Sequence, residues 1–441
     1  MTRIGIVGLG YAGLPLALAF AHDGIPVTGY DIDEERVETL RQGDDPLDEG
    51  LETKTPCITY TAAPRRLSDC DVVFVTVPTP VTAGGDPDTS ALRSAGRTIG
   101  ANLRRGALVA LRSTVYPGGT HGEFVPCVER ASGWTAGEEF GVGYAPERMS
   151  PGDDAHAFST IAKVVAAEDE THRQTLVDLF ERVVEGPVLS VSSIEACEAA
   201  KCLENVQRDV NIALMNEFAM ACDRLPEVDP GTAIEAAETK WNFHSYRPGM
   251  VDGHCVPVDP QYLAHRFEEA GHSPTLIRTA REVNDRVATH VAELVSEAVS
   301  RRSGVATATT DGGSVVDGDA TDRRGRVLAM GLAYKPDVAD LRAPTTGKAI
   351  AELGNRGFDV VGYDPHVDPD AAAARFDIPV RESLDATGFD AVVVFTGHSA
   401  FGDLDLGRLA GEMNDRPALI DVSGTVDESA ARDHGFTYRG F

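Results

Sequence analysis

Residues 4–13 read IGIVGLGYAG, a short apolar run followed at once by a Gly-x-Gly-x-x-Gly pattern. An apolar run that ends in glycines predicts a buried strand, and the apolar residues after it predict a helix. The glycines allow a tight turn and let the backbone approach a pyrophosphate, which the positive end of the helix attracts. We therefore predict a dinucleotide site at Gly8, Gly10, Tyr11, Ala12 and Gly13.

An acidic residue follows the second strand candidate. Residues 27–30 are that candidate, and Asp31 comes directly after them. A carboxylate at this place can accept a hydrogen bond from a ribose 2′-hydroxyl and repels the additional phosphate of NADP. The sequence thus predicts NAD as the cofactor. Arg36 lies nearby in the sequence, so NADP stays an alternative, as does a glycine-rich turn that binds nothing.

Strand candidates alternate with helical stretches in two parts of the chain. The candidates are residues 4–7, 27–30, 72–77, 107–111, 140–144 and 161–165, and then 326–330, 359–363, 391–395 and 418–422. This alternation predicts an α/β protein with two Rossmann-like, doubly wound parallel-sheet domains. The glycine pattern of the first part does not recur in the second, which indicates that the two domains bind different ligands.

A helical block separates these two parts. Ser192 and Glu195 form a capping box, and no Gly or Pro interrupts the chain from there to Cys222. Such a long central helix is expected to bridge domains and to offer a face to a second subunit, giving a homodimer or a larger homo-oligomer.

A second helix is expected over about 275–300. The predicted domains are 1–191, a helical central and dimerisation domain over 192–302, and 326–441. Residues 303–325 are rich in Thr, Ala, Gly, Ser and Asp and predict a flexible acidic insertion.

The composition excludes several classes of function. Asp and Glu number 69 against 40 Lys and Arg, for a net charge of −29, which argues against binding to nucleic acid. Only six of the cations are lysine, which favours a halophilic cytoplasmic protein over a merely acidic mesophilic one. We expect no signal peptide, because residues 3–7 already read as a strand and no basic start, apolar stretch and small-residue cleavage site is visible. We expect no membrane partner, because no apolar stretch approaches 18 residues. Seven cysteines without a Cys-x-x-Cys pair predict no disulfide framework and no metal site.

Seven short motifs follow one another along the chain. They are the glycine pattern at 8–13, VPTP at 77–80, STV at 113–115, PER at 146–148, KCLEN at 201–205, DGHCVPVDP at 252–260 and GLAYKP at 331–336. In order and spacing this set resembles the UDP-glucose/GDP-mannose dehydrogenase family. The resemblance covers nearly the whole chain apart from the 303–325 insertion. It implies oxidation of the C6 alcohol of a nucleotide sugar to a carboxylate with two NAD+ and no metal.

The resemblance implies a cysteine nucleophile. An aldehyde is a poor hydride donor until a nucleophile adds to it, and a thiol can do so, giving a thiohemiacetal and then a thioester. Cys255 matches the nucleophile of the family. The other six cysteines are expected to be small buried apolar residues.

Further catalytic roles follow from the same resemblance. Lys201 and Asn205 lie one helical turn apart and share a face, where they would stabilise the developing oxyanion. Lys201, Asp259 and a water molecule would together remove the proton of the alcohol. Glu147 would activate the water that hydrolyses the thioester, and Thr114 would help to order that water.

The resemblance also implies binding residues. For the cofactor it adds Val77, Pro78, Thr79, Thr114 and Arg342. For the substrate it implies Glu147, Arg148, Lys201, Asn205, Arg208, His254, Tyr334 and Lys335. Lys335 and Arg342 match positions where two cations face the diphosphate of a UDP-sugar. Residues 1–191 are thus the expected NAD-binding domain and residues 326–441 the expected UDP-sugar-binding domain.

The expected sugar is a UDP-N-acetylhexosamine. Residues 253–260 and 205–213 resemble the branch that acts on acetamido sugars, chiefly UDP-N-acetyl-D-mannosamine, in the supply of surface polysaccharide. UDP-N-acetylglucosamine and UDP-glucose stay alternatives, with GDP-mannose behind them. Two other functions also stay open as alternatives. They are a nucleotide-sugar-binding protein that has lost catalysis and an alcohol dehydrogenase that stops at the aldehyde.

One residue departs from the family pattern. Asp252 stands where the family has glycine, so we expect a small backbone shift and a negative charge that raises the pKa of the nearby thiol. Family enzymes can also complete the site with a basic residue of a neighbouring subunit. Lys240 lies in about the right region for that role, but the sequence does not align it.

Overall fold

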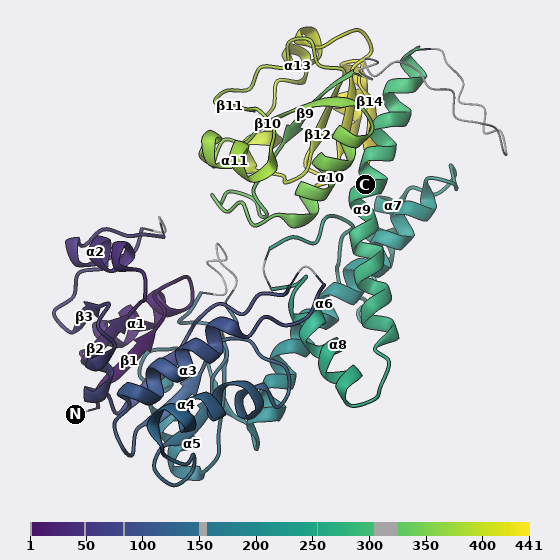
Figure 1. Ribbon diagram of the computed structural model, residues 1–441. Coiled ribbons are helices and arrows are strands. Elements are labelled where there is room, and N and C mark those ends of the chain that lie inside the picture. Colours follow the sequence, from purple (N-terminus) through teal and green to yellow (C-terminus); the bar gives the residue numbers. More distant parts are fainter. Residues whose placement is uncertain (1, 48–49, 83, 150–156, 254, 304–324) are drawn as a thin grey trace. The chain divides into compact units, whose positions relative to one another are not determined.

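A computed structural model describes residues 2–47, 50–82, 84–149, 157–253, 255–303 and 325–441. The chain divides into two units (Figure 1). The first comprises Met1–Val206 and Val258–Pro274, and the second comprises Gln207–Pro257 and Thr275–Phe441. Each unit contains one sheet covered by helices and is described by itself. The predicted insertion 303–325 falls, from 304 to 324, outside the described residues.

The first unit contains an eight-stranded sheet in the order β3-β2-β1-β4-β5-β6-β7-β8. Its strands are β1 Ile4–Val7, β2 Val27–Tyr30, β3 Ile58–Thr61, β4 Val72–Val75, β5 Leu108–Leu111, β6 Gly141–Tyr144, β7 Lys163–Ala167 and β8 Val188–Ser190. The strands from β3 to β6 are parallel, in the order of a doubly wound dinucleotide-binding sheet. The expected fully parallel sheet is wrong at one pair, because β7 runs antiparallel to β6. Antiparallel neighbours need only a loop between them, whereas parallel neighbours need a crossover.

Helices and two apolar cores cover the faces of this sheet. The helices are α1 Gly13–His22, α2 Glu34–Gln42, α3 Ser90–Asn102, α4 Val125–Ser132, α5 Glu170–Glu181 and the beginning of α6 Ile194–Cys222. This unit also contains α8 Asp259–Glu269. Side chains of β5 alternate between the two cores: Leu108 and Ala110 enter one, and Val109 and Leu111 enter the other. Burial on both faces explains why the strands are continuous apolar runs.

The second unit repeats this architecture. Its six-stranded sheet has the order β11-β10-β9-β12-β13-β14, and every neighbouring pair is parallel. The strands are β9 Gly325–Met330, β10 Phe358–Tyr363, β11 Val380–Arg381, β12 Ala391–Val394, β13 Ala418–Asp421 and β14 Thr437–Gly440. The helices are α7 Pro230–Glu238, α9 Thr275–Ser303, α10 Pro344–Asn355, α11 Pro369–Phe376, α12 Ser399–Gly402, α13 Leu406–Glu412 and α14 Glu428–Asp433. The predicted fold class, two Rossmann-like sheets with a helical middle region, is confirmed.

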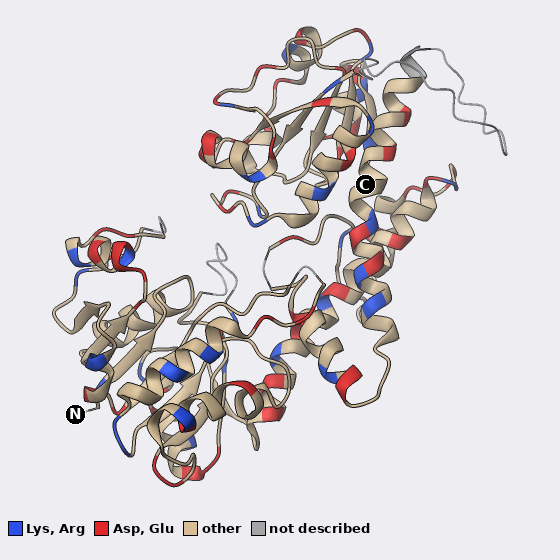
Figure 2. Cartoon of the chain, viewed as in Figure 1, with Lys and Arg blue, Asp and Glu red and all other residues tan. Residues whose placement is uncertain are grey.

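The long helix α6 contributes to both units. It has 29 residues, and the boundary between the units falls after Val206. Its cap lies one residue later than predicted: Ser193 Oγ, and not Ser192, accepts a hydrogen bond from the Ala196 N–H at 3.1 Å. Acidic positions recur on helices and loops of both units (Figure 2). Among the described residues, no helix combines the length and apolar character that crossing a membrane requires.

Candidate active site

The glycine pattern forms an open turn between β1 and α1. A Cβ at Gly13 would lie 1.9 Å from the Gly8 carbonyl oxygen, so the turn closes only with glycine there. Gly8 has a φ of +96°, which disfavours other residues. A Cβ at Gly10 would meet no atom within 4 Å. The turn therefore leaves space beside Gly10, next to the start of α1, and the N-terminal end of a helix attracts anions.

Asp31, the predicted acceptor for a ribose hydroxyl, is held in place by hydrogen bonds. It is buried at the end of β2, and its two oxygens accept hydrogen bonds from the N–H groups of Leu9 at 2.7 Å and Asp33 at 3.0 Å. The side chain of Arg36 lies 3.5 Å from the same carboxylate. The carboxylate thus reaches back to the glycine turn, while Arg36 is already paired with it.

The remaining cofactor candidates of this unit lie at the same edge of the sheet. Val77, Pro78 and Thr79 follow β4, and Thr114 follows β5. Since β2, β1, β4 and β5 are consecutive parallel neighbours, their carboxyl ends meet at one edge. That edge is where doubly wound sheets bind their ligands. Arg342, the other cofactor candidate, belongs to the second unit.

Lys201, Asn205 and Asp259 form a buried polar cluster in the first unit. Lys201 Nζ lies 3.5 Å from Asp259 Oδ2, and Asn205 Nδ2 donates a hydrogen bond to the same oxygen. Lys201 and Asn205 lie on α6, and Asp259 is the first residue of α8. Burial raises the pKa of Asp259, against the opposing effect of the Lys201 charge. A carboxylate, an ammonium and an amide thus meet at one point inside the protein.

Glu147 is surrounded by cations that the sequence analysis missed. It forms an ion pair with Arg112, and Lys163 Nζ lies 3.8 Å from its other oxygen. The N–H groups of Arg148 and Met149 also donate hydrogen bonds to it. Burial alone would raise the pKa of Glu147, but the charges of Arg112 and Lys163 outweigh burial and lower it. This carboxyl group is therefore held in its ionised form.

The sequence carries one signal that Arg112 and Lys163 are unusual, although it does not predict their contact with Glu147. Both are cations next to or within apolar strands, and both are fully buried. A buried cation requires a partner of opposite charge. Burial lowers the pKa of Lys163 to about 8, and the ring of Phe158 lies 4.0 Å from its Nζ.

Two further contacts attach α6 to the loops at the sheet edge. Arg148 forms an ion pair with Glu204 at 2.8 Å, which joins the loop after β6 to α6. Glu198 is buried and accepts hydrogen bonds from the N–H groups of Gly118 at 2.6 Å and Thr120 at 2.8 Å. Burial raises the pKa of Glu198 to about 7. The loop that follows Thr114 is therefore fixed to the helix that carries Lys201.

Cys255 lies in the second unit, in a loop that is attached to α6 through Gly249. It is half-buried, as is Cys57, while the other five cysteines are buried, and none of the seven is in a disulfide. Asn216 of α6 donates a hydrogen bond to Gly249 O at 3.1 Å and accepts one from Gly249 N–H at 2.7 Å. Burial raises the pKa of Cys70 to about 11 and of Cys197 to about 12, as expected for inert buried thiols.

Asp252 needs no positive φ, and hydrogen bonds hold its side chain. Within the described residues the positive φ of this loop falls on Gly249 and Gly253, and Asp252 has none. Its carboxylate accepts hydrogen bonds from the first turn of α10, at Thr345 N–H (2.5 Å), Thr346 N–H (3.2 Å) and Thr346 Oγ1 (2.8 Å). Burial outweighs these donors and raises the pKa of Asp252.

The substrate candidates of the second unit lie near a small cavity. The cavity has a volume of about 200 Å3 and is bounded by loops after β9, β12 and β13, including Tyr334, Pro336, Thr396 and Thr425. The point between β9 and β12 is where this sheet reverses its strand order, which is where doubly wound sheets bind ligands. Lys335 is half-buried next to Tyr334.

The other predicted residues of this unit are distributed more widely. Arg342 donates hydrogen bonds through Nε to both oxygens of Asp340, at 2.9 and 3.0 Å. Arg208 and Lys240 are exposed. His254 lies outside the described residues.

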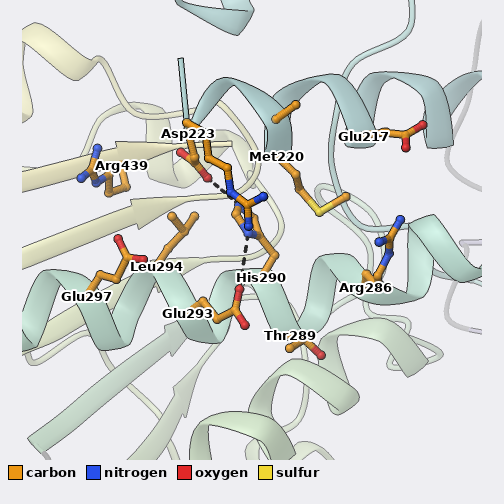
Figure 3. Close-up of a pocket in the computed structure, with 12 residues that line it drawn as sticks. Glu217, Met220, Asp223, Arg286, Thr289, His290, Glu293, Leu294, Glu297 and Arg439 are labelled. Carbon is orange, nitrogen blue, oxygen red and sulfur yellow. Dashed lines mark ion pairs between the residues drawn. The ribbon is translucent and has the colours of Figure 1, made fainter. Parts of the chain in front are cut away.

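A second cavity contains none of the predicted residues. It has a volume of about 540 Å3 and lies along α6 and α9 (Figure 3). His290 lies there between Asp223, at 2.8 Å, and Glu293, at 3.9 Å.

One group of three side chains has the composition of a metal site. Asp337, His366 and His398 present ligand atoms within 4.8 Å of one another, in the part of the chain that the structure describes. Both ring nitrogens of His398 are engaged, since Nδ1 accepts from Asp337 N–H and Nε2 contacts Asp364 at 2.9 Å. This arrangement does not leave His398 a lone pair for a metal.

Known proteins match the chain along its length. Residues 2–184 match the NAD binding domain of the UDP-glucose/GDP-mannose dehydrogenase family, residues 195–286 its central domain, and residues 328–428 its UDP binding domain. The chain is 35% identical to the UDP-N-acetyl-D-glucosamine 6-dehydrogenase of Pseudomonas aeruginosa and 34% identical to that of Salmonella typhi, over 97% and 96% of each chain. The solved structure of the UDP-D-ManNAc dehydrogenase of Pyrococcus horikoshii matches with a TM-score of 0.86 and 30% identity, over 100% of this chain and 99% of that one.

Proposed function

The chain belongs to the UDP-glucose/GDP-mannose dehydrogenase family, and on this premise we propose that it oxidises the C6 alcohol of a UDP-N-acetylhexosamine to the uronate. It is a nucleotide-sugar dehydrogenase with NAD as cofactor. The observation that carries the proposal is the buried cluster of Lys201, Asn205 and Asp259, which suits removal of a proton from an alcohol.

The first unit would hold the cofactor at its sheet edge. The glycine turn would receive the pyrophosphate, and Asp31 the ribose, while Val77, Pro78, Thr79 and Thr114 would line the same edge. When bound, NAD+ supplies the acceptor of each hydride. The ion pair between Arg36 and Asp31 supports NAD over NADP, because Arg36 is already engaged.

Lys201, Asn205 and Asp259 would act on the alcohol oxygen. As C6 loses a hydride, negative charge develops on that oxygen, and an ammonium and an amide N–H stabilise it. Asp259, 3.5 Å from Lys201 Nζ, would receive the proton directly or through a water. The product of this step is the aldehyde.

Cys255 and Glu147 would carry the second oxidation. The thiol sulfur would add to C6 of the aldehyde while the thiol proton passes to the aldehyde oxygen. This adduct becomes a thioester when C6 loses a second hydride and the hydroxyl group loses its proton. Glu147, held ionised by Arg112 and Lys163, would take a proton from the water that attacks the thioester. The sulfur then leaves, which regenerates the thiol and releases the carboxylate.

The second unit would bind the nucleotide. Lys335 and Tyr334 lie next to the cavity at the carboxyl ends of β9 and β12, and Arg342 follows them in the chain. A local cation supports attraction of a diphosphate by a chain whose net charge is −29. Arg148 and Arg208 are the further arginines proposed for the substrate.

Two epimers of the UDP-N-acetylhexosamine are candidates for the substrate. The sequence pattern predicts UDP-N-acetyl-D-mannosamine. UDP-N-acetyl-D-glucosamine is the second candidate, because the identities of 34% and 35% are with enzymes named for that sugar. A relative named for the mannosamine epimer, from Pyrococcus horikoshii, is 31% identical over 99% of this chain.

Other features stay predictions alongside this function. They are a homodimer or larger assembly through the helical middle domain, adaptation to high salt, a cytoplasmic location and the domain boundaries 1–191, 192–302 and 326–441.

The test is the yield of NADH in molar salt. The purified protein would be incubated with NAD+ and a limiting amount of UDP-N-acetyl-D-mannosamine, UDP-N-acetyl-D-glucosamine or UDP-glucose. Two NADH per sugar with an acetamido sugar is the expected result, and the sugar that is consumed identifies the epimer. Consumption of UDP-glucose alone contradicts the proposed sugar class. One NADH per sugar contradicts the second oxidation, and no NADH from any of the three contradicts the proposed function.

A further inference from the structure

Helix α10 begins without a cap of its own. Ala343 occupies the cap position and Pro344 the first helical position, and no side chain of that segment accepts from the first turn. The free N–H groups of a helix start need acceptors, which Asp, Asn, Ser or Thr at the cap usually provide. Here Asp252 provides them, from a loop far away in the sequence.

The same loop is joined to this region at three successive residues. Val251 O accepts a hydrogen bond from Thr345 Oγ1 at 2.9 Å, and Gly253 N–H donates one to Arg342 O at 3.0 Å. Asp252 lies between these two contacts and accepts from both Thr345 and Thr346. The segment 251–253 is therefore fixed to the chain from 342 to 346, immediately before Cys255.

This connection also borders the cavity at the sheet edge. Asp252 and Tyr334 both line it, and a Cβ at Gly253 would lie 3.1 Å from the Tyr334 ring. Tyr334 and Lys335 belong to the segment proposed to hold the nucleotide. A ligand that orders this segment would thus act on the residues that hold the loop.

We propose that Asp252 is a positioning residue that couples nucleotide binding in this cavity to the placement of Cys255, by joining the loop of the cysteine to the start of α10. The proposal rests on the proposed function for the roles of Cys255 and of the nucleotide. It assigns to Asp252 a use that a glycine cannot provide, because glycine has no acceptor for Thr345 and Thr346.

The test measures the reactivity of the thiol without any turnover. The rate at which iodoacetamide modifies Cys255 would be followed by mass spectrometry of its peptide, with and without saturating UDP. In the parent protein UDP is expected to slow modification by about fivefold or more, the lower end of typical coupling between sites. In Asp252→Gly this factor should fall towards one at a UDP concentration that saturates the variant, which calorimetry on the same variant establishes.

Matched variants separate coupling from loss of a cap. Asp368 caps α11, which also begins with a proline, and accepts from Ala371 N–H at 2.8 Å. Asp368→Ala removes a cap of the same kind in the same domain and should keep the full effect of UDP. Asp252→Asn retains one acceptor oxygen and should give an intermediate factor. It also serves as the deciding variant if circular dichroism shows that Asp252→Gly is unfolded.

Two results would overturn the coupling. One is a parent protein in which UDP does not change the rate at Cys255, and the other is a folded Asp252 variant that keeps the parent factor. If UDP only shields the thiol, it should slow modification equally in the parent and in the Asp252 variants, because shielding does not require Asp252. The proposed function is tested by a different experiment and is contradicted when no UDP-sugar yields NADH. In that case the alkylation rates still decide whether Asp252 couples UDP binding to Cys255.

Discussion

Lys201 and Asp259 come from different helices and bring an ammonium and a carboxylate within 3.5 Å of each other, at positions that are almost entirely buried. Removing one member of such a pair leaves the other charge without compensation. We expect Lys201→Met to lower the free energy of unfolding by about 3 kcal/mol. We expect it to reduce kcat by roughly 10²–10³-fold as well, the usual effect of removing one group that stabilises an oxyanion.

Urea denaturation and initial rates check this expectation. The double variant Lys201→Met with Asp259→Asn should lose less stability than the sum of the two single variants, because the second change removes the uncompensated charge. Strict additivity of the two changes would show that the pair does not interact.

Cys255 is expected to be necessary for the second oxidation only. Cys255→Ala should still oxidise the alcohol, but the yield should fall from two NADH per sugar to one, and the aldehyde should be trapped by a hydrazine reagent. Cys57→Ala is the control, because Cys57 is also half-buried and lies outside the proposed site. An unchanged yield of two NADH in Cys255→Ala would exclude the thioester.

Glu198 makes the stability of the protein depend on pH in a specific window. Burial raises its pKa from 4.5 to about 7 in the folded protein. The folded state therefore keeps a proton that the unfolded state loses, so the contribution to stability declines as pH rises from about 4.5 to about 7. By linkage the change is roughly 3 kcal/mol, from 1.36 kcal/mol per pKa unit.

Glu198→Gln should remove this decline. Unfolding by urea at several pH values between 4.5 and 7.5 would measure it, with Glu217→Gln on an exposed position of the same helix as control. A Glu198→Gln profile parallel to that of the parent would contradict the shifted pKa.

The glycines of the first turn are expected to respond differently to the same substitution. Gly10→Ala adds a methyl group where no atom lies within 4 Å, so stability should change by no more than about 0.5 kcal/mol. Binding of NADH, measured by its fluorescence, should weaken by about tenfold or more, since the methyl group enters the space of the pyrophosphate.

Gly13→Ala should instead impair folding. Its Cβ would lie 1.9 Å from the Gly8 carbonyl oxygen, and we expect a loss of about 3 kcal/mol from overpacking. If Gly10→Ala bound NADH as tightly as the parent, the pyrophosphate would lie elsewhere.

Local patterns in the sequence predicted most of the fold. The glycine turn and Asp31 depend on residues close together in the chain, and the apolar runs of β1, β2, β4 and β5 are long enough to detect. The strands β3, β8, β11 and β14 were missed, because their sequences are short or mixed in character. The antiparallel pairing of β7 was missed as well, since an apolar run predicts a strand but not its direction.

Contacts between distant segments could not be predicted in the same way. Arg112 and Lys163 reach Glu147 from two other strands, and no periodicity in the sequence reports that meeting. Asp252 was interpreted from its neighbours alone, as a substitute for glycine beside a thiol. Its partners Thr345 and Thr346 lie in another part of the chain, so only the folded structure reveals them.

The burial of Lys163 and Lys201 bears on how the chain distributes its cations. Of the six lysines, Lys54, Lys240 and Lys348 are exposed, whereas these two lie inside the protein, next to Glu147 and Asp259. Arginine carries a guanidinium and lysine an ammonium, and both groups are positively charged at the protein surface. Inside, the two groups differ, because arginine keeps its proton under all ordinary conditions and lysine can release one. Two of the six lysines among the chain's 40 cations therefore lie where an ammonium faces a carboxylate, and a change to arginine at either position would make that positive charge permanent.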